Sequence, residues 1–526
     1  MVNITIDGKS IQVPEGATIL DAAESVGIKI PTLCFLKDLL PITSCMLCVV
    51  KVEGRNNLLP ACATRVEEGM IVFNDDQTVT SARRTALELL LSDHAGDCIG
   101  PCQVACPAGM DIPQMIRYMA SGQYDKAIKT IKEHIALPAV TGYICPAPCE
   151  KACRRGQVDE PIAVKLIKRC AAELDLAETY PYMPESLSDL KKEVAIVGAG
   201  PAGLSAAYYL QKEGFSCTVF DDREEAGGML RYGVPEEELP RSVLEKEIEQ
   251  IHRLGVLFKQ KVQVGKDITL EEILKSFDAV FLGVGKVAED DLKKLGFDPD
   301  QKPLKVNKDT LETDIPGVFA GGDVRRGLKL TVRSLADGKK AATSILQYIN
   351  GEPVTGSGRS FNTRMGKLES GELEQLAGSA ENSQRSRKID RQKGLSPELS
   401  ENEASYCLHC DCRKAASCKL RIFAQDYEAK ASQYRGKSRA FVIRDEHPDL
   451  IFEPGKCISC GICVKITEEK REKLGLTFIG RGFDVKVTVP FDKSIKEGLA
   501  AAADEVVKAC PTGALAFREK CRRKNK

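Results

Sequence analysis

The stretch VAIVGAGPAGLSAAYYL, residues 194–210, decides the fold of the central part of this 526-residue chain. Its apolar start predicts a buried strand, and its Ala-, Leu- and Tyr-rich end predicts a helix. Between them, Gly198 permits a tight turn, Gly200 lets a pyrophosphate approach the backbone, and Gly203 lets the helix pack on the strand. Asp221 follows a second predicted strand, where it can bind ribose hydroxyls. This order of strand, helix and acid predicts a Rossmann-like, dinucleotide-binding domain, with a ligand-free glycine turn as the alternative.

Further residues indicate that the dinucleotide is FAD. Gly228 precedes the segment LRYGVP, which would pass close to the isoalloxazine ring. Gly285 ends the predicted strand and turn AVFLGVG, and Gly322 and Asp323 end VFAGGD, where Asp323 is placed for the ribityl chain. In this order the pieces resemble the flavoprotein half of the glutamate synthase small subunit and of dihydropyrimidine dehydrogenase. The resemblance implies an FAD-binding domain over residues 190–350.

Composition limits the function classes. Lys and Arg together number 75, as do Asp and Glu, so no overall charge attracts nucleic acid or an anionic membrane. No segment resembles a signal peptide or a membrane span, and we expect a soluble, cytoplasmic protein. The 21 cysteines occur in tight groups, which favours metal thiolates over disulfides in that compartment.

The first cysteine group lies in residues 1–78. Strands are predicted at Val2–Ile6 and Ile11–Val13, and a helix at Thr18–Val26. The thiolates that follow can wrap a 2Fe–2S cluster, with zinc as the alternative: Cys34, Cys45, Cys48 and Cys62. The spacing and the phrase CMLCVVKVEG resemble the N-terminal 2Fe–2S domain of the large subunits of complex I and iron-only hydrogenases. That resemblance implies a β-grasp fold.

Residues 79–185 are helical by pattern and carry two further groups of cysteines. The phrase ICPAPCEKAC resembles the two-cluster domain of the glutamate synthase small subunit, in which the two groups interleave. The resemblance implies one 4Fe–4S cluster on Cys98, Cys102 and Cys153. It implies a second 4Fe–4S cluster on Cys106, Cys145 and Cys149.

Each of these two clusters lacks a fourth cysteine. For the first, LLLSDHAGDC resembles the histidine-plus-cysteine cluster motif of complex I, which makes His94 the candidate; a surface histidine is the alternative. For the second, the family uses a carboxylate or amide where this chain has Lys168, which cannot ligate. Cys170 lies two residues further on, on a different face of the helix. We therefore expect a three-ligand or altered cluster there.

Residues 351–402 are polar and predict a long linker or an arm that embraces the other domains. A four-cysteine metal site follows within 403–435, suited to a 4Fe–4S cluster or to structural zinc: Cys407, Cys410, Cys412 and Cys418.

Residues 436–526 resemble a bacterial ferredoxin that has lost one cluster. In two-cluster ferredoxins the fourth cysteine of each run ligates the other cluster. The ligand positions of one cluster hold Thr467, Ala500, Ala503 and Val506, while those of the other are all present: Cys457, Cys460, Cys463 and Cys510. One 4Fe–4S cluster is therefore expected, with an alanine-rich helix over 495–507 in the vacated half.

Together these segments predict a multidomain α/β and α+β protein with FAD, one 2Fe–2S cluster and about three or four 4Fe–4S clusters. No catalytic side chains are evident, so the cofactors carry the chemistry. We expect an electron-transfer subunit between a partner oxidoreductase and ferredoxin or another carrier. The alternatives are a self-sufficient NAD(P)H-dependent oxidoreductase and a non-catalytic scaffold for clusters.

The segment between Gly285 and Gly321 argues against NAD(P)H. In the resembled flavoproteins a second Rossmann domain, which binds NAD(P)H, is inserted there. Here only residues 286–320 intervene, and one βαβ unit alone needs roughly 30 residues. We therefore expect the chain not to bind NAD(P)H.

Overall fold

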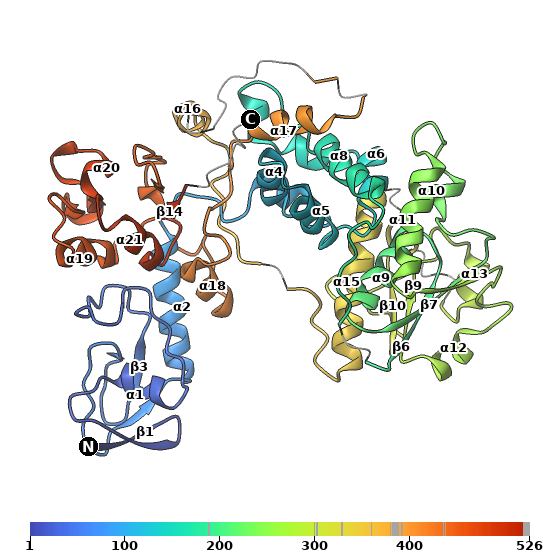
Figure 1. Ribbon diagram of the computed structural model, residues 1–526. Helices are drawn as coiled ribbons and strands as arrows, with labels where there is room; N and C mark the ends of the chain where they lie inside the picture. Colours follow the sequence, from blue (N-terminus) through green and yellow to red (C-terminus); the bar gives the residue numbers. More distant parts are fainter. Residues whose placement is uncertain are drawn as a thin grey trace. The chain divides into compact units, whose positions relative to one another are not determined.

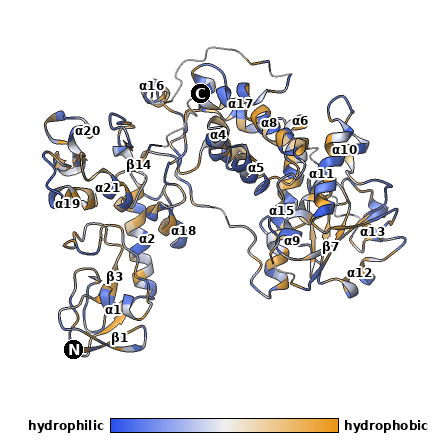
Figure 2. Cartoon of the chain, viewed as in Figure 1, coloured by the Kyte–Doolittle hydropathy of each residue, from blue (hydrophilic) through white to orange (hydrophobic). Residues whose placement is uncertain are grey.

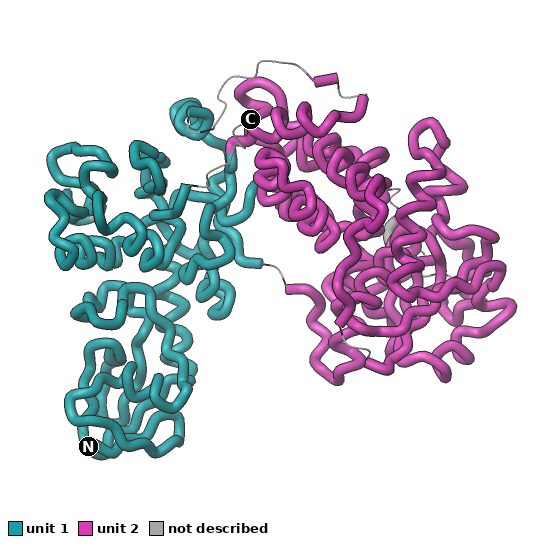
Figure 3. Tube along the Cα trace, in the orientation of Figure 1, with its two compact units in different colours: residues 1–100, 360–380, 409–520 teal, residues 101–359, 381–408, 521–526 magenta. Residues whose placement is uncertain are grey.

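A computed structural model describes residues 1–518, apart from 188–189, 299, 301–302, 328–329, 359, 379, 381–388, 391–392, 435 and 437. The chain divides into two compact units (Figure 3). Unit 1 comprises residues 1–100, 360–380 and 409–520, and unit 2 comprises residues 101–359, 381–408 and 521–526. Cys521, the last of the 21 cysteines, lies outside the described residues.

A five-stranded sheet forms the N-terminal part of unit 1 (Figure 1). Its order is β2-β1-β5-β3-β4, from β1 (Val2–Ile6), β2 (Lys9–Val13), β3 (Val49–Val52), β4 (Leu59–Pro60) and β5 (Ile71–Phe73). The helix α1 (Ile19–Ser25) begins with a capping box, in which the Asp21 amide donates to the Thr18 hydroxyl over 3.1 Å. Apolar side chains of β1 and α1 share one core. The two strands and the helix predicted here are confirmed.

The helix α2 (Gln77–Leu91) connects this sheet to the rest of unit 1 and packs on α18 (Lys419–Asp426). Its Arg83 is buried because its guanidinium finds polar partners on both sides. It donates to the Val49 carbonyl over 2.9 Å and to the Tyr427 hydroxyl over 3.0 Å. A buried arginine without such partners would be strongly destabilising.

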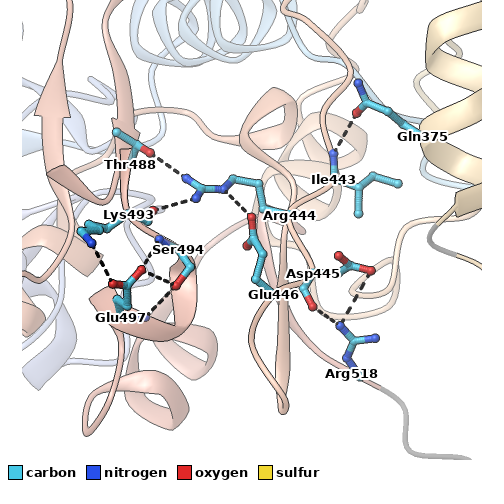
Figure 4. A network of polar contacts seen from close by, with 10 residues as sticks. All are labelled: Gln375, Ile443, Arg444, Asp445, Glu446, Thr488, Lys493, Ser494, Glu497 and Arg518. Carbon is cyan, nitrogen blue, oxygen red and sulfur yellow. Dashed lines mark hydrogen bonds and ion pairs between the residues drawn. The ribbon is translucent and has the colours of Figure 1, made fainter. Parts of the chain in front are cut away.

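The C-terminal part of unit 1 contains two small antiparallel sheets. One pairs β11 (Leu450–Phe452) with β14 (Leu515–Phe517), and the other pairs β12 (Thr477–Ile479) with β13 (Lys486–Thr488). Arg444 connects them, because its amide donates to the Phe452 carbonyl of β11 over 2.8 Å and its guanidinium donates to the Thr488 hydroxyl of β13 over 2.9 Å. Figure 4 shows the contacts of its guanidinium. The remaining helices are α16 (Ser370–Gly378), α19 (Ile462–Glu469), α20 (Ile495–Gly498) and α21 (Ala503–Ala509).

The single helix predicted over residues 495–507 is wrong, since α20 and α21 are separate. The Glu472 carboxylate accepts hydrogen bonds from the amides of Ala501 and Ala502, each over 2.7 Å. These bonds satisfy amides at the start of α21, so the chain can begin a new helix there. A carboxylate about thirty residues away in sequence is invisible to helix periodicity.

Short helices form the first part of unit 2. They are α3 (Pro101–Ala105), α4 (Ile112–Ala120), α5 (Tyr124–Lys132), α6 (Pro138–Ile144), α7 (Pro148–Lys151) and α8 (Val164–Ala177). The stretch 351–402, expected to be a linker, contributes α16 to unit 1 and the start of α17 (Pro397–Ser405) to unit 2. The helix α17 packs on α4 and α8, and its buried Glu403 accepts from the Ala163 amide over 2.9 Å. That end of the polar tract is therefore part of the folded unit.

A parallel five-stranded sheet forms the other part of unit 2, in the order β10-β9-β6-β7-β8. The strands are β6 (Glu193–Val197), β7 (Ser216–Asp221), β8 (Leu257–Gln260), β9 (Ala279–Leu282) and β10 (Val318–Ala320). The central strands are hydrophobic on both faces (Figure 2), as expected for a sheet covered by helices.

Helices α9 (Pro201–Lys212) and α15 (Thr331–Ile349) pack closely against each other. A Cβ at Gly338 would stand 2.2 Å from the Ala202 carbonyl oxygen, so only glycine fits at this crossing. The other helices of this part are α10 (Met229–Tyr232), α11 (Arg241–Arg253), α12 (Leu270–Ser276), α13 (Glu289–Lys294) and α14 (Asp323–Arg326). Among the described helices of the chain, none combines the length and apolar character needed to cross a membrane.

Candidate iron–sulfur and flavin sites

The four N-terminal cysteines converge in unit 1, and all four are buried. The Cys48 and Cys62 sulfurs are 3.3 Å apart, and the Cys45 amide donates to the Cys34 sulfur over 3.4 Å. The hydrogen bond between the Cys34 and Cys45 thiols lowers the pKa of Cys34 to about 5 and raises that of Cys45, and the bond between Cys48 and Cys62 lowers the pKa of Cys48 to about 7 and raises that of Cys62. The four buried sulfurs thus form two close pairs, and as thiolates they could ligate a metal cluster.

The four C-terminal cysteines line one cavity in the same unit. Cys457, Cys460 and Cys463 surround the start of α19, and Cys510 follows α21. Burial raises the pKa of Cys457 to about 11 and that of Cys460 to about 12. Bound iron would supply the positive charge that stabilises such buried thiolates. A single cavity bounded by four thiols fits one cluster.

These two groups lie close to each other within unit 1. The charge of Cys34 contributes to the raised pKa of Cys460, and both residues belong to one hydrophobic cluster. The N-terminal site and the C-terminal site are therefore neighbours, although more than 400 residues of sequence separate Cys34 from Cys460.

The ligand positions that the ferredoxin pattern lacks have structural contacts instead. The Thr467 hydroxyl donates to the Val464 carbonyl over 2.9 Å and accepts from the Leu476 amide over 3.1 Å. Val506 is fully buried in the apolar cluster of unit 1, and Ala503 packs against that cluster. Apolar packing thus occupies this half of the domain.

In unit 2, Cys106, Cys145 and Cys149 line a cavity together with Lys168. Burial and the neighbouring Cys106 raise the pKa of Cys149 to about 12, while Lys168 opposes the shift. The Lys168 ammonium donates to the Thr141 hydroxyl over 2.7 Å. Cys170 is buried on α8 and is not among the residues that line this cavity. The cavity therefore brings together three thiols, and the lysine lies where a fourth ligand was sought.

The remaining predicted ligands are divided between the units. Cys102, Cys153 and Cys407 belong to unit 2 and are partly buried there. Cys98, Cys410, Cys412 and Cys418 belong to unit 1. Both expected sets, the one from Cys98 to Cys153 and the one from Cys407 to Cys418, thus have members in each unit.

His94 lies on the loop after α2, in unit 1. Burial and the nearby cations Lys456 and Arg439 lower the pKa of its imidazole to about 4, although Asp93 opposes the shift. The ring is therefore neutral near pH 7, as a metal-ligating histidine must be.

Sequence reasoning missed Lys456, a buried residue whose ammonium forms an ion pair with Glu453 at 2.7 Å. Its positive charge also acts on the Cys412 thiol. The sequence places this lysine directly before Cys457, but a lysine in such a position is expected to be an ordinary surface residue. Only the packing reveals that it is buried beside another cysteine.

The predicted flavin residues gather at the carboxyl ends of β6 and β9. A Cβ at Gly203 would stand 1.9 Å from the Gly198 carbonyl oxygen, and one at Gly228 would stand 2.8 Å from the Gly200 Cα. Gly285 has a positive φ of 73°, in the turn after β9. These glycines leave open a backbone cradle at the start of α9, which suits a pyrophosphate.

The two acidic residues lie at the same edge of the sheet. Asp221 ends β7, and its carboxylate accepts from the Ala199 amide over 2.5 Å and from the Arg223 amide over 2.9 Å. Asp323 begins α14 directly after Gly322, whose amide donates to Asp337 over 3.0 Å. Both acids therefore border the glycine cradle, and the residues fit a dinucleotide such as FAD.

Family models match three parts of the chain. A 2Fe-2S iron-sulfur cluster binding domain matches residues 1–77, and dihydropyrimidine dehydrogenase domain II, 4Fe-4S cluster, matches residues 72–180. An NAD(P)-binding Rossmann-like domain matches residues 196–254, the segment that contains the glycine cradle.

Curated relatives match part of the chain. The NADP(+)-dependent formate dehydrogenase subunit beta of Moorella thermoacetica is 38% identical over 256 residues, 43% of this chain and 36% of the relative. The NADPH-Fe(3+) oxidoreductase subunit beta of Geobacter sulfurreducens is 40% identical over 187 residues, 35% of this chain and 28% of the relative. The glutamate synthase [NADPH] small chain of Mycobacterium tuberculosis is 37% identical over 195 residues, 36% of this chain and 40% of the relative.

The chain thus spans about a third of the length of these relatives. Their printed names describe subunits of oxidoreductases, and the matched domains bind iron–sulfur clusters and nucleotides. The chain thus contains segments similar to a 2Fe-2S domain, a 4Fe-4S domain and a Rossmann-like nucleotide-binding domain, and it is similar over part of its length to subunits of oxidoreductases.

Proposed function

We propose that the chain is an electron-transfer subunit that passes electrons between a partner oxidoreductase and ferredoxin or another carrier. FAD bound in unit 2 would exchange electrons in pairs, and the clusters would carry them singly. The cysteine sets described above would hold these clusters. Reduced thiolates of this number suit the cytoplasm, which we propose as the location.

The observation that carries this proposal is the proximity of two cysteine sets in unit 1. Cys34 and Cys460 belong to one hydrophobic cluster, and a Cβ at Gly461 would stand 3.1 Å from Ile42, although the two cysteines belong to different candidate sites. A cluster held only for structural reasons has no need of a second cluster beside it. Neighbouring clusters are what single-electron transfer through the protein requires, so the arrangement favours electron transfer over a scaffold.

We further propose that the chain does not use NAD(P)H by itself. Strand β9 leads to β10, its direct neighbour in the sheet, through residues 283–317. Among the described residues of that connection, one short helix forms, α13. None of these residues forms a strand of a second sheet. The Rossmann-like match falls on residues 196–254, where the glycine cradle suits FAD. A self-sufficient NAD(P)H-dependent oxidoreductase is the competing function, because relatives carry NADPH in their names.

Stopped-flow spectroscopy of the FAD-loaded chain under anaerobic conditions tests both proposals. NADH or NADPH alone should leave the flavin absorption unchanged on the timescale of turnover, whereas reduced ferredoxin should reduce the clusters and then the flavin. Rapid bleaching of the flavin by either nucleotide would establish the self-sufficient enzyme. A preparation with full clusters and no affinity for FAD would establish the scaffold.

A further inference from the structure

Two loops of unit 1, far apart in sequence, lie together and bring three thiols into one place. One loop follows α2 and contains Cys98, and the other precedes α18 and contains Cys412 and Cys418. The Cys412 amide donates to the Cys98 carbonyl over 3.3 Å. The three thiols are close enough for Cys98 to act electrostatically on both of the others. Cys412 and Cys418 are separated from Cys98 by more than 300 residues of sequence.

Glycines on both sides allow this close approach. A Cβ at Gly513 would stand 2.2 Å from the Cys412 sulfur, and a Cβ at Gly96 would stand 2.6 Å from the Lys456 Cε atom. The same added Cβ at Gly513 would stand 3.7 Å from the Lys456 Cδ atom. Lys456 therefore lies between the two loops, with its ammonium positioned to balance the charge of thiolates at Cys412.

The Cys98 side of the site is also ordered by specific contacts. The Thr363 hydroxyl lies 3.2 Å from the Cys98 sulfur and donates to the Gly96 carbonyl over 2.7 Å. The Ile99 amide donates to the Asn362 side chain over 3.0 Å. Residues 360–380 of unit 1 thus position the loop that presents Cys98.

His94 lies four residues before Cys98 on the same loop. Its ring forms no hydrogen bond with any of the residues that the structure describes, and it lies near Lys456, as Cys412 does. Since no described residue occupies either ring nitrogen, one of them can ligate a metal.

We propose that Cys98, Cys412 and Cys418 hold one 4Fe–4S cluster in unit 1, with His94 as its fourth ligand. This set replaces the expected set of Cys98 with Cys102 and Cys153, both of which belong to unit 2. In sequence, the ligands form two halves, His94-x3-Cys98 and Cys412-x5-Cys418, and most of unit 2 lies between them. Unit 2, which contains the candidate flavin site, is therefore inserted in the sequence between the two halves of a cluster domain.

The position of the site favours a cluster over a structural zinc ion. The loop that carries Cys412 and Cys418 contacts the C-terminal set, because the Lys414 ammonium donates to the Cys510 carbonyl over 2.7 Å. The Lys419 amide donates to the Pro511 carbonyl over 2.9 Å. A redox centre here would continue the series formed by the Cys34 and Cys460 sites, whereas zinc, which has no redox chemistry, would end it.

Serine variants of the full chain, purified anaerobically, test the ligand set. Cys98→Ser, Cys412→Ser and Cys418→Ser should each lose the same EPR signal and about four iron atoms per chain. Cys102→Ser is the matched control, since it is the next cysteine after Cys98, and it should retain that signal. If Cys98→Ser and Cys102→Ser abolish one signal while Cys412→Ser retains it, the proposed set is wrong. Loss of zinc with unchanged iron in Cys412→Ser would also overturn it.

A second pair of variants tests His94 without removing a thiolate. His94→Cys should keep the iron content and shift the EPR g values and the potential of the same cluster, because a thiolate would replace the imidazole. His94→Ala should change the same signal and leave those of the Cys34 and Cys460 sites unaltered. If both variants reproduce the native spectrum and potential, His94 is not a ligand.

Discussion

Substitution of Gly513 by alanine is the most exact steric test of the Cys412 site. The new Cβ would stand 2.2 Å from the Cys412 sulfur, and real Cβ contacts are essentially never shorter than 3.0 Å. The thiol must therefore move by about 0.8 Å, the difference between 3.0 and 2.2 Å. Metal and active sites tolerate displacements of only roughly 0.5 Å. Because Cys412 is only 8% exposed, little free space exists into which the sulfur could move.

We expect Gly513→Ala to lose or strongly alter the EPR signal that Cys412→Ser removes. Overpacking of this kind costs about 1–3 kcal/mol, so the chain should still fold. FAD content and the 2Fe–2S signal should remain unchanged. The assay is EPR with iron quantitation on anaerobically purified protein, with thermal unfolding as a check on folding.

The matched control is Gly371→Ala in α16, where an added Cβ meets no atom within 4 Å. Alanine is the better helix former, so this variant should be at least as stable as the native chain and keep every signal. A native spectrum in Gly513→Ala would show that the Cys412 sulfur is not held beside Gly513, and the steric argument would fail. Equal loss of every centre in a folded protein would also refute it.

Three other predictions concern the other sites. Cys48→Ser should abolish the 2Fe–2S EPR signal and leave the 4Fe–4S signals intact, because its sulfur lies 3.3 Å from that of Cys62; an unchanged signal would exclude it as a ligand. Asp323→Ala should weaken FAD retention, measured by fluorescence after gel filtration, without changing the iron content. Lys132→Met should destabilise unit 2 by about 3–5 kcal/mol, because it leaves the Asp175 carboxylate, now 2.6 Å from the ammonium, buried without its cation. Urea unfolding measures this loss, with the exposed Lys129→Met as the control, and equal effects of the two substitutions would contradict the expectation.

Local patterns in the sequence were sufficient for the elements whose determinants are local. The alternating strand at Val2–Ile6 and the capped helix after Thr18 are predictable because side-chain periodicity and capping act over a few residues. The same holds for the strand, glycine turn and helix at 194–210, and for close pairs such as Cys457 and Cys460. In each case neighbours in sequence are also neighbours in space.

Tertiary structure decided the features that depend on distant residues. Glu472 divides the helix expected over 495–507, and α17 joins a helical core because Glu403 reaches the Ala163 amide. The family resemblance groups Cys98 with Cys102 and Cys153, whereas in the folded chain Lys456 packs between Gly96 and Gly513 and the Cys412 amide donates to the Cys98 carbonyl. The sequence by itself determined which residues are candidates for binding iron and flavin, since that is a matter of chemical type and local spacing. Which thiols share a site was decided only by the long-range packing of the folded chain.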